Sequence, residues 1–565
     1  MNNEKKRVYK PLAIRKALTT DGYKLSHFEQ YPKTLTSIYG NLTARSEKNF
    51  KQRLPSSDNK YVVAGIWQAM VEINDIFQKE FFSVSFDKAI GPMKKTIENY
   101  TKYKIGYENC LKRIHKLGYL PIKIRSIKEG TSIDINMPAI TIQSEDVLLF
   151  SFLEPMITNM TWKTKTNDTN ERELYITGMK WSKKTGNVDA VPYQFHDFST
   201  RGMSGIEDAC RSNVSHLIAF RGTESTGVLT YIEDVYDWDY KTDGALAGTI
   251  EATEHSVAST NIMYEKAIRG CDLEEAEYHY FKRYITEVYP NGYVGYVADT
   301  FDFFRTISVI LPKLKSEVMA RDGKLVIRPD SFEPIYGLCG LNLPYIEEPN
   351  VSEIDYDLFD NLISEHSACD SKGVFRTDKN VVTATRSNGV IKLEVREMTN
   401  EEMGTVQILW NTFGGTLNEN GYRDLDSHIG VIYGDGINNV VADEIFKQLA
   451  KNKFSSTNVV VGIGAGAYQW VSRDTLGIAY KATQVVTSDI GAIDVYKDPV
   501  GGFKKSATGL LAVNKVDGDW FLTQKATIEQ EEKSEMYTVF DNGSMPELKF
   551  ATIRDNFIKD NENMY

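Results

Sequence analysis

The residues best suited to chemistry in this chain are charged, aromatic or glycine residues that follow short apolar runs. The segment "KLVIRPDS" places Arg328 and Asp330 at the end of such a run. Two positions apart on a strand, both side chains leave the same face. A planar cation beside a carboxylate can hold an aromatic amide or a phosphate together with a sugar hydroxyl. An internal Arg–Asp ion pair explains the same spacing equally well.

A glycine-rich stretch, "VVVGIGAGAYQW", also follows an apolar run. The backbone amides of Gly464, Ala465 and Gly466 would suit a phosphate at a helix start. The spacing is neither the dinucleotide fingerprint nor a Walker motif, because no lysine follows. Arg473, just downstream, adds a bidentate phosphate donor. Tight packing around these glycines, with no ligand bound, explains the stretch equally well.

One histidine, His255 in "ATEHSVAST", has no second histidine or cysteine near it in the sequence. A metal site built on this residue is therefore not supported. Glu254 precedes it and is a candidate for setting the tautomer of the ring. From the residues alone, a core or capping histidine is the more common role.

The elements that must position these residues recur between about 190 and 480 as a short apolar strand, a polar or glycine end, and a helix. Such alternation predicts a parallel sheet, and the number of units favours a closed α/β barrel. Barrels of this kind carry their active sites at the C-terminal ends of the strands. Alternatively, Asp and Gly at these positions only form the turns between strand and helix. The recurrence of the pattern in six units makes this alternative less favourable. The strand-end residues are Phe198, Arg201, Arg221, Glu224, Asp299, Arg328, Asp330, Gly434, Asp435, Gly464 and Gly466.

The rest of the chain lacks this rhythm and predicts a second, mixed α+β domain built from both termini. We expect residues 1–190 to form its N-terminal part and 481–565 to complete it. The barrel then occupies 191–480, with an excursion at about 365–427 that includes a hairpin.

Composition excludes several classes of protein. The 565-residue chain has a net charge of −11, which argues against a general nucleic-acid coat. Its five cysteines form no CxxC pair, so a disulfide framework is not supported. No apolar run is long enough for a membrane span, and the basic N-terminus lacks the apolar core of a signal peptide. We expect a cytoplasmic protein with no membrane partner.

The motifs "TDGYKLSHFEQYP", "HDFSTRG", "EATEHS", "VADTFD", "IRPDS", "YGDGIN", "GIGAGA…VSRD" and "VYKDPV" occur here in one order. In these motifs, from about residue 18 to 555, the chain resembles the nicotinamide phosphoribosyltransferases, which are type II phosphoribosyltransferases. The resemblance implies an irregular (β/α) barrel and the conversion of nicotinamide and phosphoribosyl pyrophosphate to nicotinamide mononucleotide and pyrophosphate. It also implies a homodimer whose active sites lie at the interface.

The resemblance assigns roles to individual residues. Phe198, and Tyr23 from the partner chain, would sandwich the pyridine ring, and flat aromatic faces suit a flat heterocycle. Arg201 and Arg328 would lie around the nicotinamide and the reacting sugar. The remaining substrate positions that it implies are Asp21, Arg45, Asp299, Asp330, Gly434, Asp435, Gly464, Ala465, Gly466, Arg473, Lys481 and Lys497.

The resemblance also gives His255 a function. In that family the matching histidine is phosphorylated by ATP, and hydrolysis of the phosphohistidine is coupled to phosphoribosyl transfer. An imidazole nitrogen is a competent nucleophile near neutral pH, and the small neighbours leave room for a phosphate. ATP is therefore expected as a co-substrate, with Mg²⁺ bound through substrate phosphates.

Three departures from the family pattern stand out. Glu224 replaces the aspartate that contacts the nicotinamide amide. Ala465 and Ala479 replace a glycine and a serine of the animal members. The segment between Arg328 and Asp435 is longer than in the animal enzymes.

Two other functions are weighed against this one. A nicotinate- or quinolinate-using enzyme would need cations for the substrate carboxylate, and a carboxylate at position 224 argues against both. A non-catalytic sensor of NAD metabolites would be favoured by loss of His255, Asp330 or Arg328, and all three are present.

Overall fold

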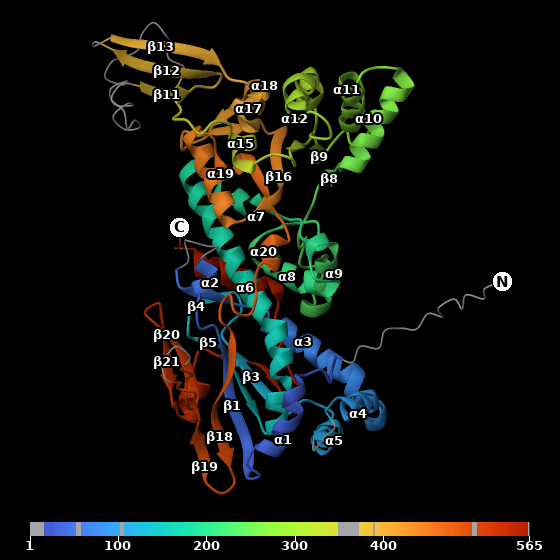
Figure 1. The fold of residues 1–565 in the computed structure, drawn as a ribbon, viewed down its shortest axis with the longest axis vertical. Helices are drawn as coiled ribbons and strands as arrows, with labels where there is room; N and C mark the ends of the chain where they lie inside the picture. Colours follow the sequence, from blue (N-terminus) through green and yellow to red (C-terminus); the bar gives the residue numbers. More distant parts are fainter. Residues whose placement is uncertain are drawn as a thin grey trace, which may run out of the picture.

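A computed structural model of the chain describes residues 16–51, 58–101, 107–347, 372–387, 390–499, 505–562 and 564. Two large sheets lie one above the other along the longest axis of the molecule (Figure 1). The upper sheet is parallel and the lower one antiparallel. The predicted excursion at 365–427 falls partly outside the described residues, at 365–371 and 388–389.

The parallel sheet contains seven strands whose spatial order differs from their order in the chain. Its central strands are almost wholly buried apolar runs, as expected where both faces of a sheet are covered. In spatial order the strands are β7 (Gly222–Thr223), β6 (Phe195–Asp197), β17 (Val459–Ile463), β16 (Ile429–Ile437), β10 (Leu325–Arg328), β9 (Val294–Val297) and β8 (Glu251–Ala252).

The two edges of this sheet meet. Gly248, shortly before β8, pairs in parallel with Gly222 of β7. The Gly248 amide donates to the Arg221 carbonyl at 2.8 Å, and the Thr223 amide donates to the Gly248 carbonyl at 3.2 Å. The sheet is therefore closed, and its two-residue edge strands make it irregular, which confirms the predicted irregular barrel.

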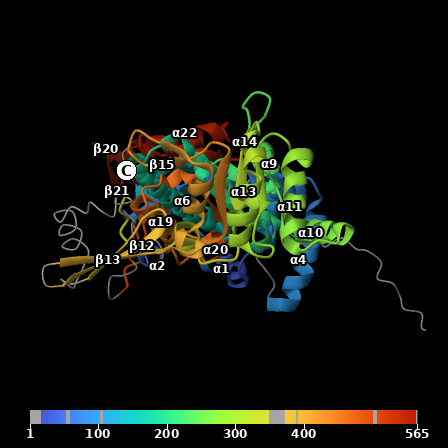
Figure 2. The same cartoon turned by 90° about the horizontal axis from the view of Figure 1, so that it is seen from above.

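Helices surround the barrel and connect its strands (Figure 2). They are α8 (Ile206–Ala219), α9 (Thr226–Tyr236), α10 (His255–Arg269), α11 (Leu273–Arg283), α12 (Phe303–Arg305), α13 (Leu311–Lys313), α14 (Lys315–Met319), α15 (Pro334–Cys339), α17 (Asn400–Met403), α18 (Thr405–Phe413), α19 (Asn439–Lys451) and α20 (Gly466–Gln469).

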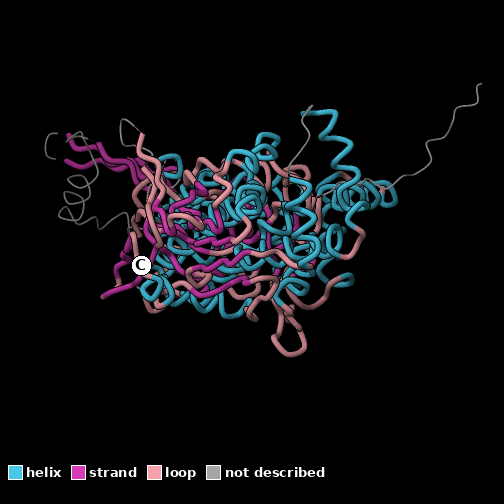
Figure 3. Tube along the Cα trace, turned by 90° about the horizontal axis from the view of Figure 1, so that it is seen from below, coloured by secondary structure: helices cyan, strands magenta, loops and turns pink. Residues whose placement is uncertain are grey.

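A three-stranded antiparallel sheet of β11 (Lys372–Arg376), β12 (Asn380–Ser387) and β13 (Val390–Glu397) interrupts the barrel rhythm. It projects from the body of the molecule on the side opposite α10 and α11 (Figures 1, 2 and 3). Arg376 anchors it, because its buried guanidinium donates to the carbonyls of Cys339, Leu341 and Met403. A smaller hairpin, β14 (Gly415–Leu417) and β15 (Arg423–Leu425), follows.

The antiparallel sheet takes strands from both ends of the chain, so the second domain is built from both termini, as predicted. Its strands, in spatial order, are β19 (Gly491–Asp494), β18 (Ala479–Thr487), β1 (Leu35–Thr43), β5 (Pro138–Ser144), β3 (Ile122–Ser126) and β22 (Tyr537–Asp541). Two further strand pairs accompany it: β2 (Lys60–Val63) with β4 (Thr131–Asp134), and β20 (Leu511–Val516) with β21 (Asp519–Gln524). The helices of this part are α1 (His27–Gln30), α2 (Lys48–Lys51), α3 (Ile66–Phe77), α4 (Phe86–Thr101), α5 (Tyr107–Leu117), α6 (Val147–Thr185), α21 (Ile528–Glu532) and α22 (Phe550–Asn561). The short helix α7 (Val191–Gln194) packs instead on the barrel strands β6, β7 and β17.

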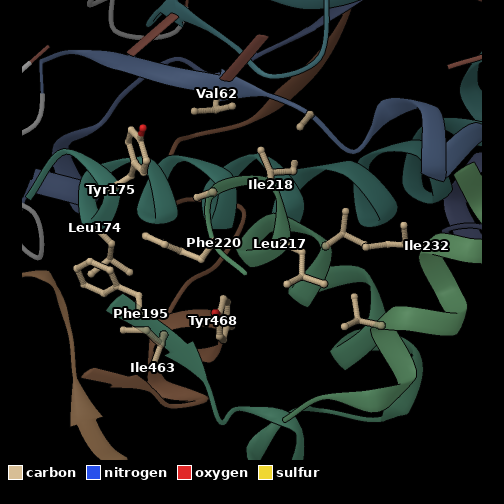
Figure 4. Packing of buried hydrophobic residues seen from close by; sticks show 14 of the residues in the cluster. Val62, Leu174, Tyr175, Phe195, Leu217, Ile218, Phe220, Ile232, Ile463 and Tyr468 are labelled. Atoms are coloured by element: carbon tan, nitrogen blue, oxygen red, sulfur yellow. The ribbon is translucent and has the colours of Figure 1, made fainter. Parts of the chain in front are cut away.

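The 39-residue helix α6 joins the two parts, packing on α8 and α19 of the barrel and on β2. Its fully buried Arg172 pairs with Asp58 at 2.7 Å and donates to Asn561 of α22 at 2.7 Å. Apolar side chains of the same helix, such as Leu174, meet Phe195 at the start of β6 (Figure 4). The core is therefore continuous from α6 into the barrel, which fixes the strand that precedes Phe198.

Candidate active site

A cavity of about 2000 Å³ lies in the barrel and reaches the C-terminal ends of its strands. This is the end at which barrels of this type place their active sites. The cavity is lined by nine of the predicted site residues: Phe198, Arg201, Glu224, Arg328, Asp330, Gly434, Gly464, Ala465 and Gly466.

Arg328 and Asp330 leave β10 together, and the ion pair that their spacing suggested is present, while the ligand site stays a prediction. The Arg328 Nη2 atom lies 3.3 Å from Asp330 Oδ2, and both side chains line the cavity. The guanidinium also lies over the Phe198 ring, 5.4 Å from its centroid. Arg328 Nε and Asp330 Oδ1 are buried and have no hydrogen-bond partner within the described residues. Buried polar atoms are normally paired, so these two atoms are suited to a ligand.

Gly462, inside β17, and Gly464, just after it, differ in what surrounds them. A side chain at Gly462 would come within 2.8 Å of both Gly434 and the Phe198 ring, so this glycine is required by packing. Nothing lies within 4 Å of the equivalent position on Gly464, which faces the cavity. The backbone of Gly464 is therefore accessible to a ligand. The predicted following helix is the four-residue α20, so any anion contact here would depend on the loop amides.

His255 begins α10 beside a smaller hollow of about 270 Å³, which it lines with Arg201, Arg328 and Asp330. Its Nε2 atom lies 2.9 Å from Asp299 Oδ1, and 49% of its side chain is exposed. Asp299 Oδ2 accepts from the Asp330 amide at 3.1 Å and from the Ser331 hydroxyl. Asp299 thus connects the histidine to the loop after β10.

The sequence pointed to Glu254 as the residue that sets the His255 tautomer, but in the structure the contact to the ring comes from Asp299. The Glu254 carboxylate accepts from the Ser256 hydroxyl, and it is Asp299 that contacts the ring. The physical reason is the helix start at His255. Glu254 occupies the N-cap with extended backbone, and Asp299 follows the neighbouring strand β9.

Glu224 extends into the cavity from the end of β7. Its Oε1 atom accepts from His196 Nε2 at 2.8 Å and from the Thr249 hydroxyl. Burial alone would raise the pKa of the Glu224 carboxyl. The hydrogen bonds from His196 and Thr249, together with the charges of His196 and Arg328, outweigh burial and lower that pKa. The carboxylate is therefore ionised at neutral pH.

A buried aspartate, Asp197, ties the ends of β6 and β7 together. Its Oδ1 atom accepts from the Ser199 amide at 3.0 Å, and Oδ2 accepts from Thr223 Oγ1 at 2.8 Å and Ser225 Oγ at 2.5 Å. The Asp197 carbonyl also accepts from the Glu224 amide at 2.9 Å. These bonds fix the backbone on both sides of Phe198 and Glu224.

The predicted basic residues Arg45, Arg473, Lys481 and Lys497 form a second group, in the part that carries the antiparallel sheet. Burial lowers the pKa of Lys481, and the positive charges of Arg45, Lys497 and Arg473 lower it further. Arg45 donates to the Gly477 carbonyl at 3.0 Å. None of these four side chains lines either hollow described above. Arg473 lies 3.7 Å from Asp474, and four cations gathered in this way suit a polyanion.

Besides these four basic residues, three predicted residues lie apart from the cavity or cannot be placed. Tyr23 and Asp21, at the start of the chain, line neither hollow, and 64% of Tyr23 is exposed. The Tyr23 ring packs edge-on against His27 at 5.3 Å. Asp435 belongs to β16, but its side chain lies outside the described residues.

Sequence reasoning missed three residues that shape the site: His196, Asp197 and Thr249. The first two belong to the quoted motif "HDFSTRG" and precede the strand-end Phe198, which was a usable signal. Thr249 carries no local signal, because its role depends on closure of the barrel.

Within the described ranges, no three His, Cys, Asp or Glu side chains are grouped so that they could hold a metal ion. In the same part of the chain, no helix combines the length and apolarity needed to span a membrane.

The chain matches one protein-family model and is similar to named relatives and to a solved structure. Residues 193–544 match the sequence model of the nicotinate phosphoribosyltransferase (NAPRTase) family. The chain is 32% identical over 539 residues to a nicotinamide phosphoribosyltransferase of Acinetobacter baylyi, covering 93% of each chain. It is 28% identical over 510 residues to a nicotinamide phosphoribosyltransferase of Mycoplasma pneumoniae, covering 88% of this chain and 95% of the relative. The crystal structure of human nicotinic acid phosphoribosyltransferase superposes with a TM-score of 0.48 at 12% identity, over 96% and 93% of the two chains.

Proposed function

The chain belongs to the nicotinate phosphoribosyltransferase family of pentosyltransferases, and from this premise we propose that it makes nicotinamide mononucleotide for NAD salvage. The substrates are nicotinamide and phosphoribosyl pyrophosphate, and the second product is pyrophosphate. The choice of nicotinamide over nicotinate rests on one observation: the carboxylate of Glu224 lines the same cavity as Phe198, and it accepts hydrogen bonds that lower its pKa. A carboxylate accepts a hydrogen bond from an amide NH₂ but repels a substrate carboxylate.

The transfer itself needs positioning more than a base. The pyridine nitrogen attacks C1 of the ribose while pyrophosphate departs through an oxocarbenium-like state. Phe198 supplies a flat face for the ring, and Arg328 places a cation beside that face. The Asp330 carboxylate lines the same cavity, where it would accept a hydrogen bond from a ribose hydroxyl. Such preorganised charges act without reorganising during the reaction.

A divalent cation fits the same residues. Mg²⁺ favours carboxylate oxygens and usually binds through one or two of them together with substrate phosphates. Asp330 would supply such an oxygen, which agrees with the unpaired Oδ1 atom. When bound, Mg²⁺ would stabilise the charge of the leaving pyrophosphate.

The proposal includes ATP as co-substrate and His255 as the acceptor of its γ-phosphate. If Nε2 of His255 carries the proton and donates a hydrogen bond to Asp299, Nδ1 keeps its lone pair. Nδ1 can then attack the γ-phosphorus of ATP as the bond to the leaving ADP breaks. Half of the His255 side chain is exposed beside Arg201 and Arg328, two cations suited to phosphate oxygens.

The choice of substrate is tested by comparing kcat/KM for nicotinamide and nicotinate, each with phosphoribosyl pyrophosphate and Mg²⁺. Two like charges about 4 Å apart cost several kcal/mol at an effective dielectric near 20. The positive charge of Arg328 offsets part of this repulsion. We therefore expect a preference for nicotinamide of roughly a hundredfold, about 2.8 kcal/mol.

Variants of Glu224 refine this test. Glu224→Gln removes the negative charge, so kcat/KM for nicotinate should rise. The ratio of kcat/KM for nicotinamide to that for nicotinate should then fall. Glu224→Asp is the matched control, since it keeps the charge and should keep the preference. Equal kcat/KM for both bases in the wild-type enzyme would rule out Glu224 as the selector, and no mononucleotide from either base would reject the proposed function.

We also propose a homodimer with shared sites. Tyr23 is exposed and lines neither hollow of its own chain, so a contact with the substrate requires it to come from a partner. The basic group of Arg45, Arg473, Lys481 and Lys497 then supplies cations for the phosphate and pyrophosphate groups.

Complementation tests the shared site. Tyr23→Ala and Arg328→Ala should each be nearly inactive, while an exchanged mixture should regain about one quarter of wild-type activity, because half of the dimers contain one intact site. The control is the same mixture after cross-linking that prevents exchange. If subunits demonstrably exchange and activity stays at the level of the separate variants, the shared-site model is wrong.

A further inference from the structure

Among the described residues, hydrogen-bond donors reach only one of the two oxygens of the Glu224 carboxylate. Both of its side-chain hydrogen bonds, from His196 Nε2 and from the Thr249 hydroxyl, end on Oε1. Within the described part of the chain, no donor reaches Oε2. The side chain is 42% exposed and lines the cavity, so Oε2 is accessible to a bound molecule.

The two donors come from opposite sides of Glu224. His196 belongs to β6, the neighbour of β7 in the sheet. A side chain at Gly222 would lie 2.4 Å from His196 Nδ1, so only glycine at that position allows the ring to lie against β7. Thr249 follows Gly248, the residue that closes the barrel by pairing with β7. The closure of the barrel therefore brings Thr249 to Glu224.

We propose that His196 and Thr249 are positioning residues that hold Oε1 of Glu224 and so present Oε2 as the single acceptor for the amide NH₂ of the substrate. This inference rests on the proposed function. A glutamate has one more rotatable bond than the aspartate expected at this position, and a flexible side chain loses conformational entropy when it is ordered. Two hydrogen bonds to one oxygen restrict that freedom before the substrate arrives, which is preorganisation.

The other charged group that acts on Glu224 is Arg328, whose positive charge stabilises the carboxylate from the side of β10. Arg328 is also held by Asp330 and stacked over Phe198. Arg328 therefore stabilises the negative charge of the Glu224 carboxylate, whereas His196 and Thr249 fix the orientation of that carboxylate.

Thr249→Val tests the inference, since valine has nearly the same shape and lacks the hydroxyl. Because Thr249 is exposed, folding should be unaffected. We expect kcat/KM for nicotinamide to fall roughly tenfold, mainly through KM, as for the loss of one hydrogen bond to a charged group. The kcat/KM for nicotinate should change little, because the charge of Glu224 is unaltered. Thr249→Ser, which keeps the hydroxyl, should retain the wild-type ratio between the two substrates.

A double-mutant cycle distinguishes positioning from a general structural effect. In a Glu224→Ala background, Thr249→Val should have little further effect on nicotinamide, because Thr249 acts through Glu224. His196→Phe, which keeps an aromatic ring but removes the donor, should reduce nicotinamide kcat/KM in the same direction and show the same dependence on Glu224.

The outcomes separate the two levels of the proposal. If the wild-type protein forms no mononucleotide from nicotinamide, the proposed function fails. If it does, and Thr249→Val either keeps wild-type kcat/KM or loses the same factor with and without Glu224, the positioning role is overturned.

Discussion

Replacing Arg328 by alanine is expected to lower kcat/KM for nicotinamide by between about a hundredfold and a thousandfold. Loss of one preorganised group that stabilises transition-state charge costs about 2.7–4 kcal/mol. Arg328 contacts Phe198 and Asp330 and lines both hollows. In the proposed reaction its removal should therefore weaken the binding of the pyridine ring, the sugar and the phosphates together. Steady-state kinetics with both substrates varied measure the effect.

Two further variants sharpen this test. Arg328→Lys keeps the charge but not the planar fork, so it should recover only part of the activity. Arg305→Ala is the matched control, because Arg305 is an exposed arginine of α12 that lines neither hollow. Wild-type kcat/KM in Arg328→Ala, with the fold intact by circular dichroism, would remove Arg328 from the site.

Replacing His255 by alanine is expected to reduce ATP hydrolysis to background, by more than a hundredfold, and to abolish acid-labile phosphate incorporation. The reason is that a covalent intermediate cannot form without its nucleophile. Slow mononucleotide synthesis without ATP should remain, because Phe198, Arg328 and Asp330 are unchanged. Radiolabelled ATP, followed by acid and base treatment of the protein, measures the phosphohistidine directly.

Asp299 and a second histidine provide the controls. Asp299→Asn should slow phosphorylation without abolishing it, since the amide can still accept from Nε2 but no longer stabilises a charged ring. His279→Ala, on the neighbouring α11, should behave as wild type. ATP stimulation that persists undiminished in His255→Ala would refute the phosphohistidine proposal.

Much of the catalytic half of the molecule could be predicted from local patterns. Continuous apolar runs predict buried parallel strands, and the carboxyl ends of such strands share one edge of a barrel. That rule brings Phe198, Glu224, Arg328 and Gly464 to one cavity, as the structure does. The rule works because it depends only on strand direction and not on which strand lies beside which.

Individual contacts could not be predicted in this way. Glu254 is adjacent to His255 in sequence, yet Asp299 is its partner, because the helix begins between them and β9 lies next to β8. Likewise, the spacing of Arg328 and Asp330 suggested either an ion pair or a ligand site. Only the tertiary structure reveals that the ion pair forms while one buried polar atom of each side chain has no partner among the described residues.

The sequence by itself determined the barrel, the second domain drawn from both termini, the family, and the residue types available at the strand ends. Only the tertiary structure decided that Glu224 is held on one oxygen by His196 and Thr249, and that Tyr23 lies away from the cavity of its own chain. The physical reason is that hydrophobic periodicity and strand direction are local properties of the chain. A hydrogen bond between distant residues requires a separation accurate to a few tenths of an ångström, which depends on strand order, on closure of the sheet and on the packing of the whole core.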